Sequence, residues 1–237
     1  MDHTVLICDD DPDILNALEI YLRQDGYDVV RAANGHEAVC AAKDEAVHLI
    51  VMDVMMPHTD GIKAAAAIRG ASNVPIIFLS AKSEEADRIL GLMMGGDDYV
   101  SKPFNPAELL ARVRAALRRY TRLGGIKAAV GYKSLAGFYQ TGGLVLDDNK
   151  KRVEAEGEEV QLTAIEYSIL RLLMSEPDRV FTSAQIYEAV WDEPAFNVAK
   201  TVSVHIRHIR EKIEINPKEP KYLKVLYGLG YKVVKIK

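Results

Sequence analysis

The segments Val5-Leu-Ile-Cys-Asp-Asp10 and Leu49-Ile-Val-Met-Asp53 decide the fold class of this chain. Each is a short apolar run, partly β-branched, that stops at an acidic side chain. Runs of this kind are typical of strands buried inside a parallel sheet, because helices cover both faces of such a sheet. Ile76–Leu79 repeats the pattern and stops at Ser80, so we expect at least three buried strands in the first half.

Helical periodicity fills the intervals between these runs. Val29–Ala32 is a more polar strand candidate, and Tyr99–Val100 ends a weaker one just before Lys102. Asn105 and Pro106 are suited to the N-cap and first position of a helix. The expected helices are 13–24, 35–43, 61–69, 84–94 and 105–119. Alternating strands and helices of this length predict an α/β domain with a five-stranded parallel sheet and helices on both faces.

Length and composition limit the class of protein. The 237 residues suffice for two domains, and the content of 49% apolar and 27% charged residues is ordinary for a soluble globular protein. No apolar run approaches the roughly 18–20 residues of a membrane span, so we expect a cytoplasmic protein with no membrane partner. Cys8 and Cys40 lack metal-like spacing and are interpreted as small core residues.

The net charge of −4 hides an asymmetry between the two halves. Residues 1–120 carry 12 basic and 19 acidic side chains, whereas the remainder carries 18 basic and 15 acidic ones. A mildly basic second half makes nucleic acid a candidate partner for it.

The chain changes character after residue 120. Residues 121–142 are rich in glycine and are interpreted as a linker. Alternating runs at 144–146, 152–155 and 159–162 then predict short antiparallel strands. Thr163-Ala-Ile-Glu166 is a capping box that opens a helix to about Ser175, and further helices are expected at 183–191 and 198–213. Residues 223–234 are typical of a hairpin with glycines at its turn. We therefore expect domains at 1–120 and 143–237.

Polar side chains follow the predicted strands of the first half at the point where each strand ends. Asp9 and Asp10 follow the first strand, Asp53 ends the third, Ser80 the fourth, and Lys102 follows the fifth. The carboxyl ends of parallel strands meet at one edge of the sheet, where ligands bind in open α/β folds. Strand ends are commonly polar, but that explains poorly three acids, a hydroxyl and a lysine at one edge.

The chemistry of this set suits phosphoryl transfer. Carboxylates fit Mg²⁺, which takes octahedral oxygen ligands and offsets repulsion between the acids and an incoming phosphoryl group. A carboxylate can then act as the nucleophile and form an acyl phosphate. A hydroxyl and an ammonium group can stabilise the phosphoryl oxygens, because this reaction depends mostly on positioning and electrostatics.

Several ordered motifs resemble the receiver domain of two-component response regulators. These motifs are Val5–Asp10, Met52–Pro57 with Gly61, Phe78–Ala81, Gly95–Tyr99 and Lys102–Phe104, and the match covers about residues 3–120. The resemblance implies a flavodoxin-like fold with Asp53 as phosphoacceptor. Serine at position 80 and glycine at position 96 depart from the commoner threonine and alanine. Asp11 is an additional acid that we interpret as an exposed loop charge.

The resemblance also implies roles for the side chains around Asp53. The implied ligands of Mg²⁺ are Asp10, Asp53 and the backbone carbonyl of Met55, with Asp9 in support. The implied contacts of the phosphoryl group are Ser80 and Lys102, and the implied switch pair is Ser80 with Tyr99.

The segments Leu162–Leu170, Thr201–Lys212 and Gly228–Tyr231 resemble the winged helix-turn-helix domain of OmpR/PhoB-type regulators. A mixed-charge helix such as 198–213 would alone be taken as a solvated surface helix. Two helices before it and a hairpin after it favour a helix that enters the major groove. The implied DNA contacts are Lys200, His205, Arg207, His208 and Arg210. Tyr227 departs from the family pattern at the wing, where a basic residue or tryptophan is frequent. Residues 117–120 and 205–212 are similar to VanR-type regulators of glycopeptide resistance.

The resemblance further implies partners. These are a sensor histidine kinase, promoter DNA, a second copy of the chain and RNA polymerase. In this family, phosphorylated receivers pair through the fourth helix, fifth strand and fifth helix. The charged residues expected at that face are Arg88, Asp97, Asp98, Glu108, Arg112 and Arg119. Paired receivers predict direct-repeat DNA sites about one helical turn, ~10–11 bp, apart.

Two other functions stay open on the sequence alone. A haloacid-dehalogenase-like phosphatase also uses acids at strand ends with Mg²⁺. It needs a second aspartate two residues after the nucleophile, where Met55 stands, and it leaves residues 143–237 unexplained. A constitutive DNA-binding regulator would use the receiver only as a dimerisation scaffold. We favour a phosphorylation-activated transcriptional regulator whose main role is not enzymatic, since a receiver only assists its own phosphorylation and dephosphorylation.

Overall fold

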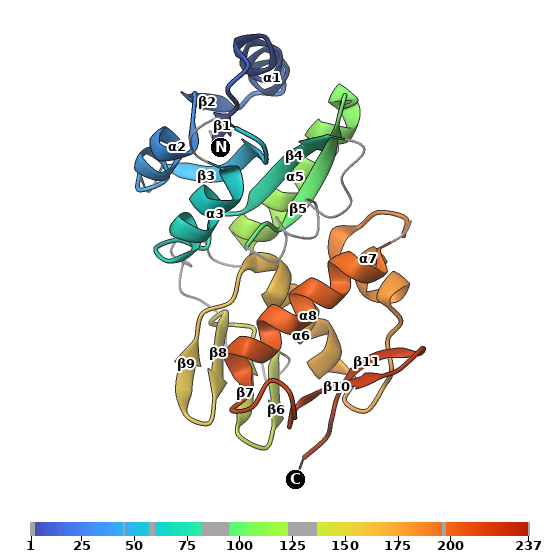
Figure 1. Ribbon diagram of the computed structural model, residues 1–237. Coiled ribbons are helices and arrows are strands. Elements are labelled where there is room, and N and C mark those ends of the chain that lie inside the picture. The colour runs from blue at the N-terminus through green and yellow to red at the C-terminus, as the bar shows by residue number, and fades with distance from the viewer. Residues whose placement is uncertain are drawn as a thin grey trace. The chain divides into compact units, whose positions relative to one another are not determined.

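The computed structural model describes residues 3–44, 46–56, 60–81, 95–122, 137–195 and 198–236. The chain forms two compact units, Met1–Gly125 and Ile126–Lys237, called here the N-terminal and C-terminal units (Figure 1). None of the helices in the described ranges combines the length and the hydrophobicity that crossing a bilayer requires.

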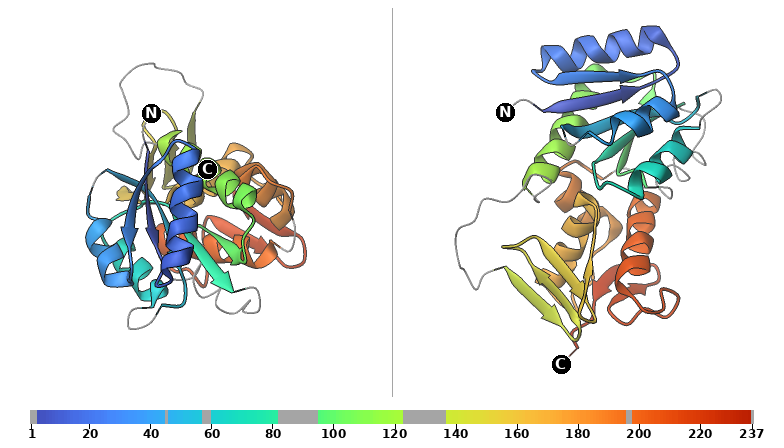
Figure 2. Two further views of the ribbon diagram at one scale, coloured as in Figure 1. Left: turned by 90° about the horizontal axis from the view of Figure 1, so that it is seen from above. Right: turned by 90° about the vertical axis from the view of Figure 1, so that its left-hand side faces the viewer.

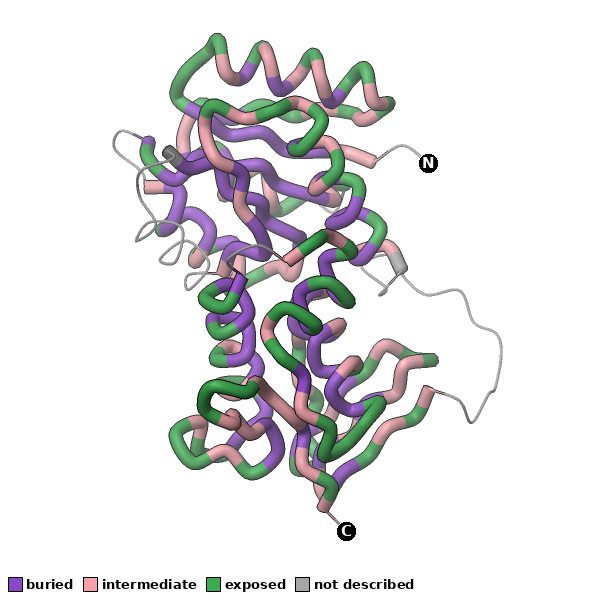
Figure 3. The backbone as a smooth tube through the Cα atoms, turned by 90° about the vertical axis from the view of Figure 1, so that its right-hand side faces the viewer, coloured by how far each residue is buried: buried purple, intermediate pink, exposed green. Residues whose placement is uncertain are grey.

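Five parallel strands in the order β2-β1-β3-β4-β5 form the centre of the N-terminal unit. They are β1 (Thr4–Cys8), β2 (Asp28–Ala32), β3 (Val47–Asp53), β4 (Ile76–Ala81) and β5 (Asp98–Lys102). The three central strands are almost wholly buried, as the predicted apolar runs require (Figure 3). The predicted five-stranded parallel sheet is confirmed.

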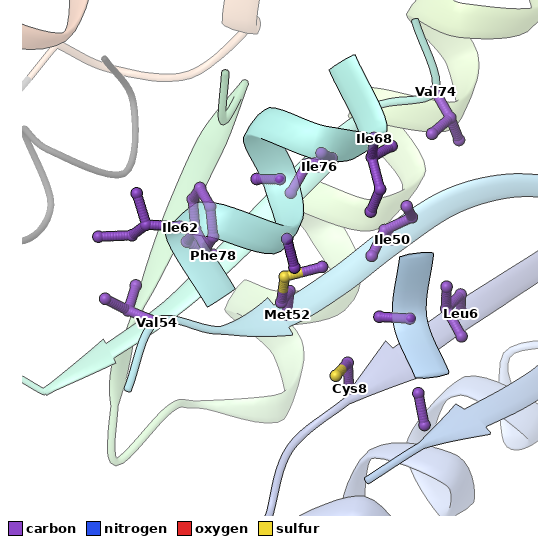
Figure 4. Close-up of a cluster of buried hydrophobic side chains, with 14 of the residues drawn as sticks. Leu6, Cys8, Ile50, Met52, Val54, Ile62, Ile68, Val74, Ile76 and Phe78 are labelled. Carbon is purple, nitrogen blue, oxygen red and sulfur yellow. The ribbon is translucent and has the colours of Figure 1, made fainter. Parts of the chain in front are cut away.

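Helices cover both faces of this sheet. They are α1 (Pro12–Gln24), α2 (Gly35–Ala41), α3 (Gly61–Arg69) and α5 (Pro106–Arg122). Successive strand residues point to opposite faces, so each central strand contributes to two cores. One core contains Leu6, Ile50 and Phe78 from the strands with Ile62 and Ile68 from α3 (Figure 4). The other contains Ile7, Val51 and Leu79 with Leu18 of α1 and Val113 of α5. The helix expected at 84–94 lies outside the described residues.

Side-chain caps fix where all four of these helices begin, and Asn105 has the predicted role for α5. Asp11 accepts a hydrogen bond from the backbone N–H of Asp13 at 2.8 Å, and Asp60 accepts one from Ile62 at 2.9 Å. Asn34 caps α2 in the same way. Such caps satisfy N–H groups that have no partner inside the helix. Asp11 is therefore an exposed helix cap, in agreement with its interpretation as a loop charge.

The two cysteines have opposite environments. Cys8 is fully buried, with its Sγ 3.5 Å from Sδ of Met56, and burial together with the nearby charge of Asp9 raises the pKa of its thiol to about 12. Cys40 is exposed on the outer face of α2, one turn after the exposed His36. The prediction of a core residue is thus correct for Cys8 and wrong for Cys40, because the buried face of this short helix is occupied by Gly35 and Ala38.

The C-terminal unit begins with a four-stranded antiparallel sheet. Its strands are β6 (Phe138–Thr141), β7 (Leu144–Asp147), β8 (Arg152–Ala155) and β9 (Glu158–Val160), in sequential order. Strand β6 falls inside the range 121–142 that we interpreted as linker. It is an edge strand in which only Thr141 is buried, so it lacks the apolar alternation that identifies a strand. Residues 123–136 of that range lie outside the described residues.

Three helices and a hairpin complete this unit. The helices are α6 (Ala164–Ser175), α7 (Ser183–Trp191) and α8 (Ala199–Ile213), and they pack against one another. Helix α6 also packs against β6, so it lies between the sheet and α8 (Figure 2). The predicted capping box at Thr163 and Glu166 is confirmed, and Thr182 with Gln185 forms a second one before α7. The hairpin consists of β10 (Leu223–Leu226) and β11 (Gly230–Val233).

Asp148, in the turn between β7 and β8, connects the sheet to α6. Its Oδ1 accepts hydrogen bonds from the Tyr167 hydroxyl at 2.7 Å and from Lys151 Nζ at 2.6 Å. Burial alone would raise the pKa of the Asp148 carboxyl, but these hydrogen bonds and the charge of Lys151 together lower it. The folded state therefore favours the ionised carboxylate at this position.

Candidate functional site

Three carboxylates meet at the carboxyl edge of the N-terminal sheet. Asp9 and Asp10 directly follow β1, and Asp53 is the last residue of β3, which pairs with β1. One oxygen from each of the three acids lies within 4.8 Å of the others. Asp9 and Asp53 are buried and Asp10 is exposed. We call these three residues, with Lys102, the acidic site.

Lys102, the last residue of β5, holds the two buried acids together. Its Nζ lies 2.7 Å from Oδ2 of Asp9 and 2.8 Å from Oδ1 of Asp53. Burial raises the pKa of the Asp53 carboxyl, although the hydrogen bond and charge of Lys102 oppose the shift. Burial also works against the charged form of Lys102, but its hydrogen bonds to Asp53 and Asp9 outweigh that effect and raise the pKa of its ammonium group. The acids and the lysine are thus electrostatically coupled.

The hydroxyl of Ser80 is available at the same edge of the sheet. Ser80 lies next to the end of β4, two strands from β1 and adjacent to β3, and it is 2% exposed. Its Oγ is buried and has no hydrogen-bond partner among the described residues. Leaving a buried hydroxyl unpaired costs free energy, so this oxygen is suited to a ligand that supplies an acceptor.

Tyr99 is on β5, three residues before Lys102. Its ring is half-buried against the core that contains Ile76 and Phe78, and the guanidinium carbon of Arg112 lies 6.0 Å from the ring centroid. The ring is therefore turned partly inward in this structure.

Gly61 allows α3 to begin directly against the acidic site. A Cβ atom at this position would lie 1.9 Å from the carbonyl oxygen of Asp53. The backbone N–H of Gly61 also donates to the carbonyl of Val54 at 3.2 Å. The close approach requires glycine and fixes the backbone on the C-terminal side of Asp53. The sequence contained this glycine as part of a motif, but only the structure shows the reason for it.

The acidic site has the chemistry of a site for a hard divalent cation. Mg²⁺ prefers oxygen ligands and commonly binds one or two carboxylates with water and phosphate oxygens. The three clustered aspartates supply such oxygens, and their combined negative charge exceeds the charge of Lys102. The donor set therefore fits Mg²⁺. Met55 is 63% exposed, and only its backbone carbonyl, not its side chain, was expected to take part in this site.

The C-terminal unit presents one face of α8 to solvent. Val202, Ile206 and Ile209 are buried against the other helices, whereas Lys200, Ser203 and Arg207 are exposed. Gly230 lets the hairpin pack closely against Phe181, in the segment just before α7. Its φ is +144°, and a Cβ there would lie 2.0 Å from the carbonyl oxygen of Phe181. Three packed helices followed by a hairpin agree with the predicted winged helix-turn-helix arrangement.

Comparison with known proteins matches both units. Residues 5–114 match the family model described as response regulator receiver domain, and residues 157–233 match the model described as transcriptional regulatory protein, C terminal. Regulatory protein VanR from Enterococcus faecium is 37% identical over 99% of this chain and 100% of its own length. Transcriptional regulatory protein ResD from Bacillus subtilis is 38% identical over 96% and 94%. The chain belongs to the OmpR/PhoB-type response regulators.

One solved structure shows the same fold over nearly the whole chain. A mutant of RitR, with a TM-score of 0.74 and 22% identity, covers 98% of this chain and 99% of its own. As an OmpR/PhoB-type response regulator, this protein is a two-component transcriptional regulator with a receiver domain and a DNA-binding domain.

The expected DNA contacts of this response regulator fall into different environments. Lys200 and Arg207 are exposed, with Arg207 Nε 2.7 Å from Glu211 of the next turn. His208 is half-buried, 3.8 Å from the buried carboxylate of Glu166. Arg210 is also half-buried, and its Nη2 has no hydrogen-bond partner within the described part of the chain.

The position of His205 contradicts the expectation that this residue contacts DNA. It is 1% exposed, and its ring centroid lies 5.5 Å from that of Trp191 in α7. A side chain enclosed in the helix packing cannot reach a base or a phosphate without opening the core. The structure therefore places His205 in the core of the C-terminal unit, because its position on the helix coincides with the apolar face.

Three of the charged residues expected at a dimer face, Asp98, Glu108 and Arg112, bind one another within the chain. Arg112 Nη1 lies 3.0 Å from both carboxylate oxygens of Asp98, and its Nη2 lies 3.2 Å from Glu108. Asp98 is 2% exposed and Asp97 is 3% exposed, so neither carboxylate is presented to a partner in this structure. Glu108 is exposed and Arg119 is largely buried. Arg88 lies outside the described residues.

Arg69 is a residue that the sequence analysis missed. Its guanidinium donates to the carbonyls of Gly95 and Val74 at 2.7 and 2.5 Å, and to the carboxylate of Asp97 at 2.5 Å. Asp97 in turn accepts from the backbone N–H of Ile76 at 2.9 Å. This network connects the end of α3 to the starts of β4 and β5. Its members are far apart in sequence, and no local motif signals it.

Proposed function

We propose that Asp53 accepts a phosphoryl group from a sensor histidine kinase and that this modification controls DNA binding in the cytoplasm. The observation that carries the proposal is the grouping of Asp53 with two further carboxylates and Lys102 at one edge of the sheet. Three clustered acids, of which Lys102 contacts only two, are hard to explain as structural, because their mutual repulsion destabilises the fold.

The reaction follows from the positions of these groups. A carboxylate oxygen of Asp53 attacks the phosphorus of a phosphohistidine, so that a P–O bond forms as the P–N bond breaks and the imidazole leaves. Asp10, Asp53 and the backbone carbonyl of Met55, with Asp9 in support, would hold Mg²⁺, which would supply positive charge beside the phosphoryl oxygens. Lys102 already contacts Asp53 and can hold a phosphoryl oxygen, and the unpaired Ser80 hydroxyl can hold another.

The phosphoryl group would then change the surface of the receiver. Movement of the Ser80 hydroxyl toward the phosphoryl oxygens leaves space that the partly buried ring of Tyr99 can enter. This pair lies on β4 and on the edge strand β5, which leads into α5. We propose that the resulting surface pairs with a second copy, and that Glu108, Arg112 and neighbouring charges exchange intrachain contacts for intermolecular ones.

Pairing would bring two DNA-binding units onto one promoter. The exposed face of α8 enters the major groove, where Lys200, Arg207, His208 and Arg210 contact the DNA. Two joined units bind more tightly than one, so the favoured sites are direct repeats about one helical turn, ~10–11 bp, apart. Contact with RNA polymerase would follow from this placement at promoters.

The decisive experiment is selection of bound fragments from a genomic DNA library. The protein is tested with and without acetyl phosphate and Mg²⁺, as wild type, as Asp53→Ala and as Asp28→Ala. Asp28 is an exposed acid at the start of the edge strand β2, so it controls for loss of one negative charge. We expect the phosphodonor to tighten binding to tandem repeats for wild type and Asp28→Ala, and to have no effect on Asp53→Ala.

Equal binding by all three proteins with and without the phosphodonor would contradict this proposal. The alternative of a constitutive regulator, with the receiver as a dimerisation scaffold, would then replace it. Isolated half-sites in the selected fragments would contradict the proposed pairing but not the phosphorylation.

A further inference from the structure

Glu214, the residue that ends α8, is an acid where an isolated carboxylate is unfavourable. The C-terminal end of a helix carries partial negative charge, so a nearby anion is repelled. Glu214 is also only 7% exposed, and burial of an unpaired carboxylate is costly. Its contacts must offset both effects.

Three consecutive backbone amides donate to this carboxylate. Oε2 of Glu214 accepts from the N–H of Lys221 at 2.6 Å, and Oε1 accepts from Tyr222 at 2.9 Å and from Leu223 at 2.8 Å. Hydrogen bonds to an ionised acceptor are roughly twice as strong as neutral ones. Glu214 thereby holds the start of β10 against the last turn of α8.

Arg210 strengthens the same connection from one turn earlier. Its Nε donates to the carbonyl of Leu223 at 2.9 Å, so α8 holds both the N–H and the C=O of that residue. Leu223 pairs with Val233 across the hairpin. The end of α8 is thus hydrogen-bonded to β10 and, through the pairing of β10 with β11, connected to both strands of the hairpin.

We infer that Glu214 is a positioning residue that joins α8 and the β10–β11 hairpin into one rigid DNA-reading element. The inference rests on the proposed function, in which α8 enters the major groove, and adds that the hairpin tip also contacts the DNA, at a fixed offset from α8. The tip carries Tyr227 and Leu229, which are 91% and 62% exposed. A fixed offset makes a DNA site intolerant of altered spacing between the bases that α8 contacts and the segment that the tip contacts.

The four-stranded sheet holds the same segment from a second side. Oε1 of Glu156 accepts from Lys221 Nζ at 2.7 Å and from the hydroxyl of Tyr222, which itself accepts from the N–H of Gly143 at 3.1 Å. None of these contacts involves α8. A change at Glu156 therefore loosens the segment from the sheet without loosening it from α8.

The test compares Glu214→Gln with two control variants in the full-length protein. The substitution replaces one acceptor oxygen with an amide group that donates, so at least one of the three backbone hydrogen bonds is lost. Glu219→Gln removes the same charge from an exposed position in the same connection. Glu156→Gln weakens the hold of the sheet instead. The readouts are amide hydrogen exchange and hydroxyl-radical footprinting on a fragment selected from the genomic library.

We expect the amides of residues 221–223 to exchange at least about tenfold faster in Glu214→Gln than in wild type. DNA affinity should fall by about tenfold, with weaker protection opposite the hairpin tip and unchanged protection opposite α8. Both controls should keep the wild-type footprint. An unchanged footprint for Glu214→Gln, or an equal loss for Glu219→Gln, would overturn the inference.

Two further measurements keep the outcomes separate. If Glu214→Gln does not fold, amide hydrogen exchange in the wild type decides whether α8 and the hairpin form one rigid element. The amides of 221–223 and of the last turn of α8 should then open together, and exchange of 221–223 about 100-fold faster than that turn would refute the rigid element. The double variant Lys200→Ala with Arg207→Ala tests the proposed function alone. If it binds DNA like wild type, α8 is not the DNA-facing helix, whatever Glu214 does.

Discussion

Replacement of Gly61 by alanine is the substitution whose effect follows most directly from the geometry. The added Cβ would lie 1.9 Å from the carbonyl oxygen of Asp53, whereas such atoms do not approach closer than 3.0 Å. The end of β3 and the start of α3 must therefore separate by about 1 Å. This separation also strains the hydrogen bond from the N–H of Gly61 to the carbonyl of Val54.

Two magnitudes follow for Gly61→Ala. Overpacking typically costs about 1–3 kcal/mol and a lost hydrogen bond about 1 kcal/mol, so the free energy of unfolding of the N-terminal unit should fall by about 2–4 kcal/mol. A displacement of about 1 Å at the reacting carboxylate also alters its 2.8 Å contact with Lys102. Misplacement of this size costs about 10²-fold in rate, so phosphorylation by acetyl phosphate should slow by roughly that factor.

Gly70→Ala provides the matched control at the other end of α3. Its φ is −65°, and a Cβ there would lie 3.4 Å from the nearest atom, which is ordinary contact. Urea denaturation gives the stability of both variants, and phosphate-affinity gels give the phosphorylation rate. The reasoning is refuted if Gly61→Ala stays within about 0.5 kcal/mol and twofold of wild type, or if Gly70→Ala is affected equally.

Three other variants test separate parts of the fold. Arg69→Ala leaves the carboxylate of Asp97 buried without its cation and should lower the unfolding free energy of the N-terminal unit by about 3–5 kcal/mol in urea denaturation; a loss below 1 kcal/mol would contradict the network. His205→Ala should destabilise the C-terminal unit by about 2–4 kcal/mol but leave the salt dependence of DNA binding unchanged. A reduced salt dependence would mean that a direct phosphate contact had been lost and would contradict the buried position. Asp148→Asn removes a carboxyl whose pKa is lowered by folding. Wild type should therefore be the more stable protein above pH ~4, the ordinary carboxyl pKa. This advantage should disappear as the pH falls through the lower pKa of the folded state. Thermal melting at pH 7 and pH 3 measures the stability difference between wild type and Asp148→Asn. A difference in favour of wild type that grows in acid would contradict a lowered pKa of Asp148.

The sequence predicts those parts of the fold whose signals are local. Buried parallel strands are apolar on both faces, so β1, β3 and β4 are recognisable from continuous runs. Helix starts are recognisable because a cap and its partner are three residues apart, as for Thr163 and Glu166. The acidic site was predictable for a related reason, since parallel strand ends must converge at one edge.

Features that depend on distant contacts could not be predicted in this way. Arg69 reaches Gly95 and Asp97, and nothing near Arg69 in the sequence indicates those partners. His205 is spaced three and four residues from the buried Val202 and Ile209, so its position fits the apolar face of α8, but the family resemblance assigned it to the DNA. Its distant partner Trp191 in α7 shows that it is enclosed. Strand β6 is held by its neighbour β7 and not by an apolar pattern of its own.

The contrast between the two cysteines leaves one thiol of the native protein accessible to thiol-reactive reagents. A maleimide reacts with an accessible thiolate, and Cys8 is both buried and shifted to a pKa of about 12. Cys40 is exposed on α2 and is the other cysteine of the chain. A fluorescent label would therefore attach at Cys40 alone in the native state, and the appearance of a second reactive thiol would report the opening of the receiver core.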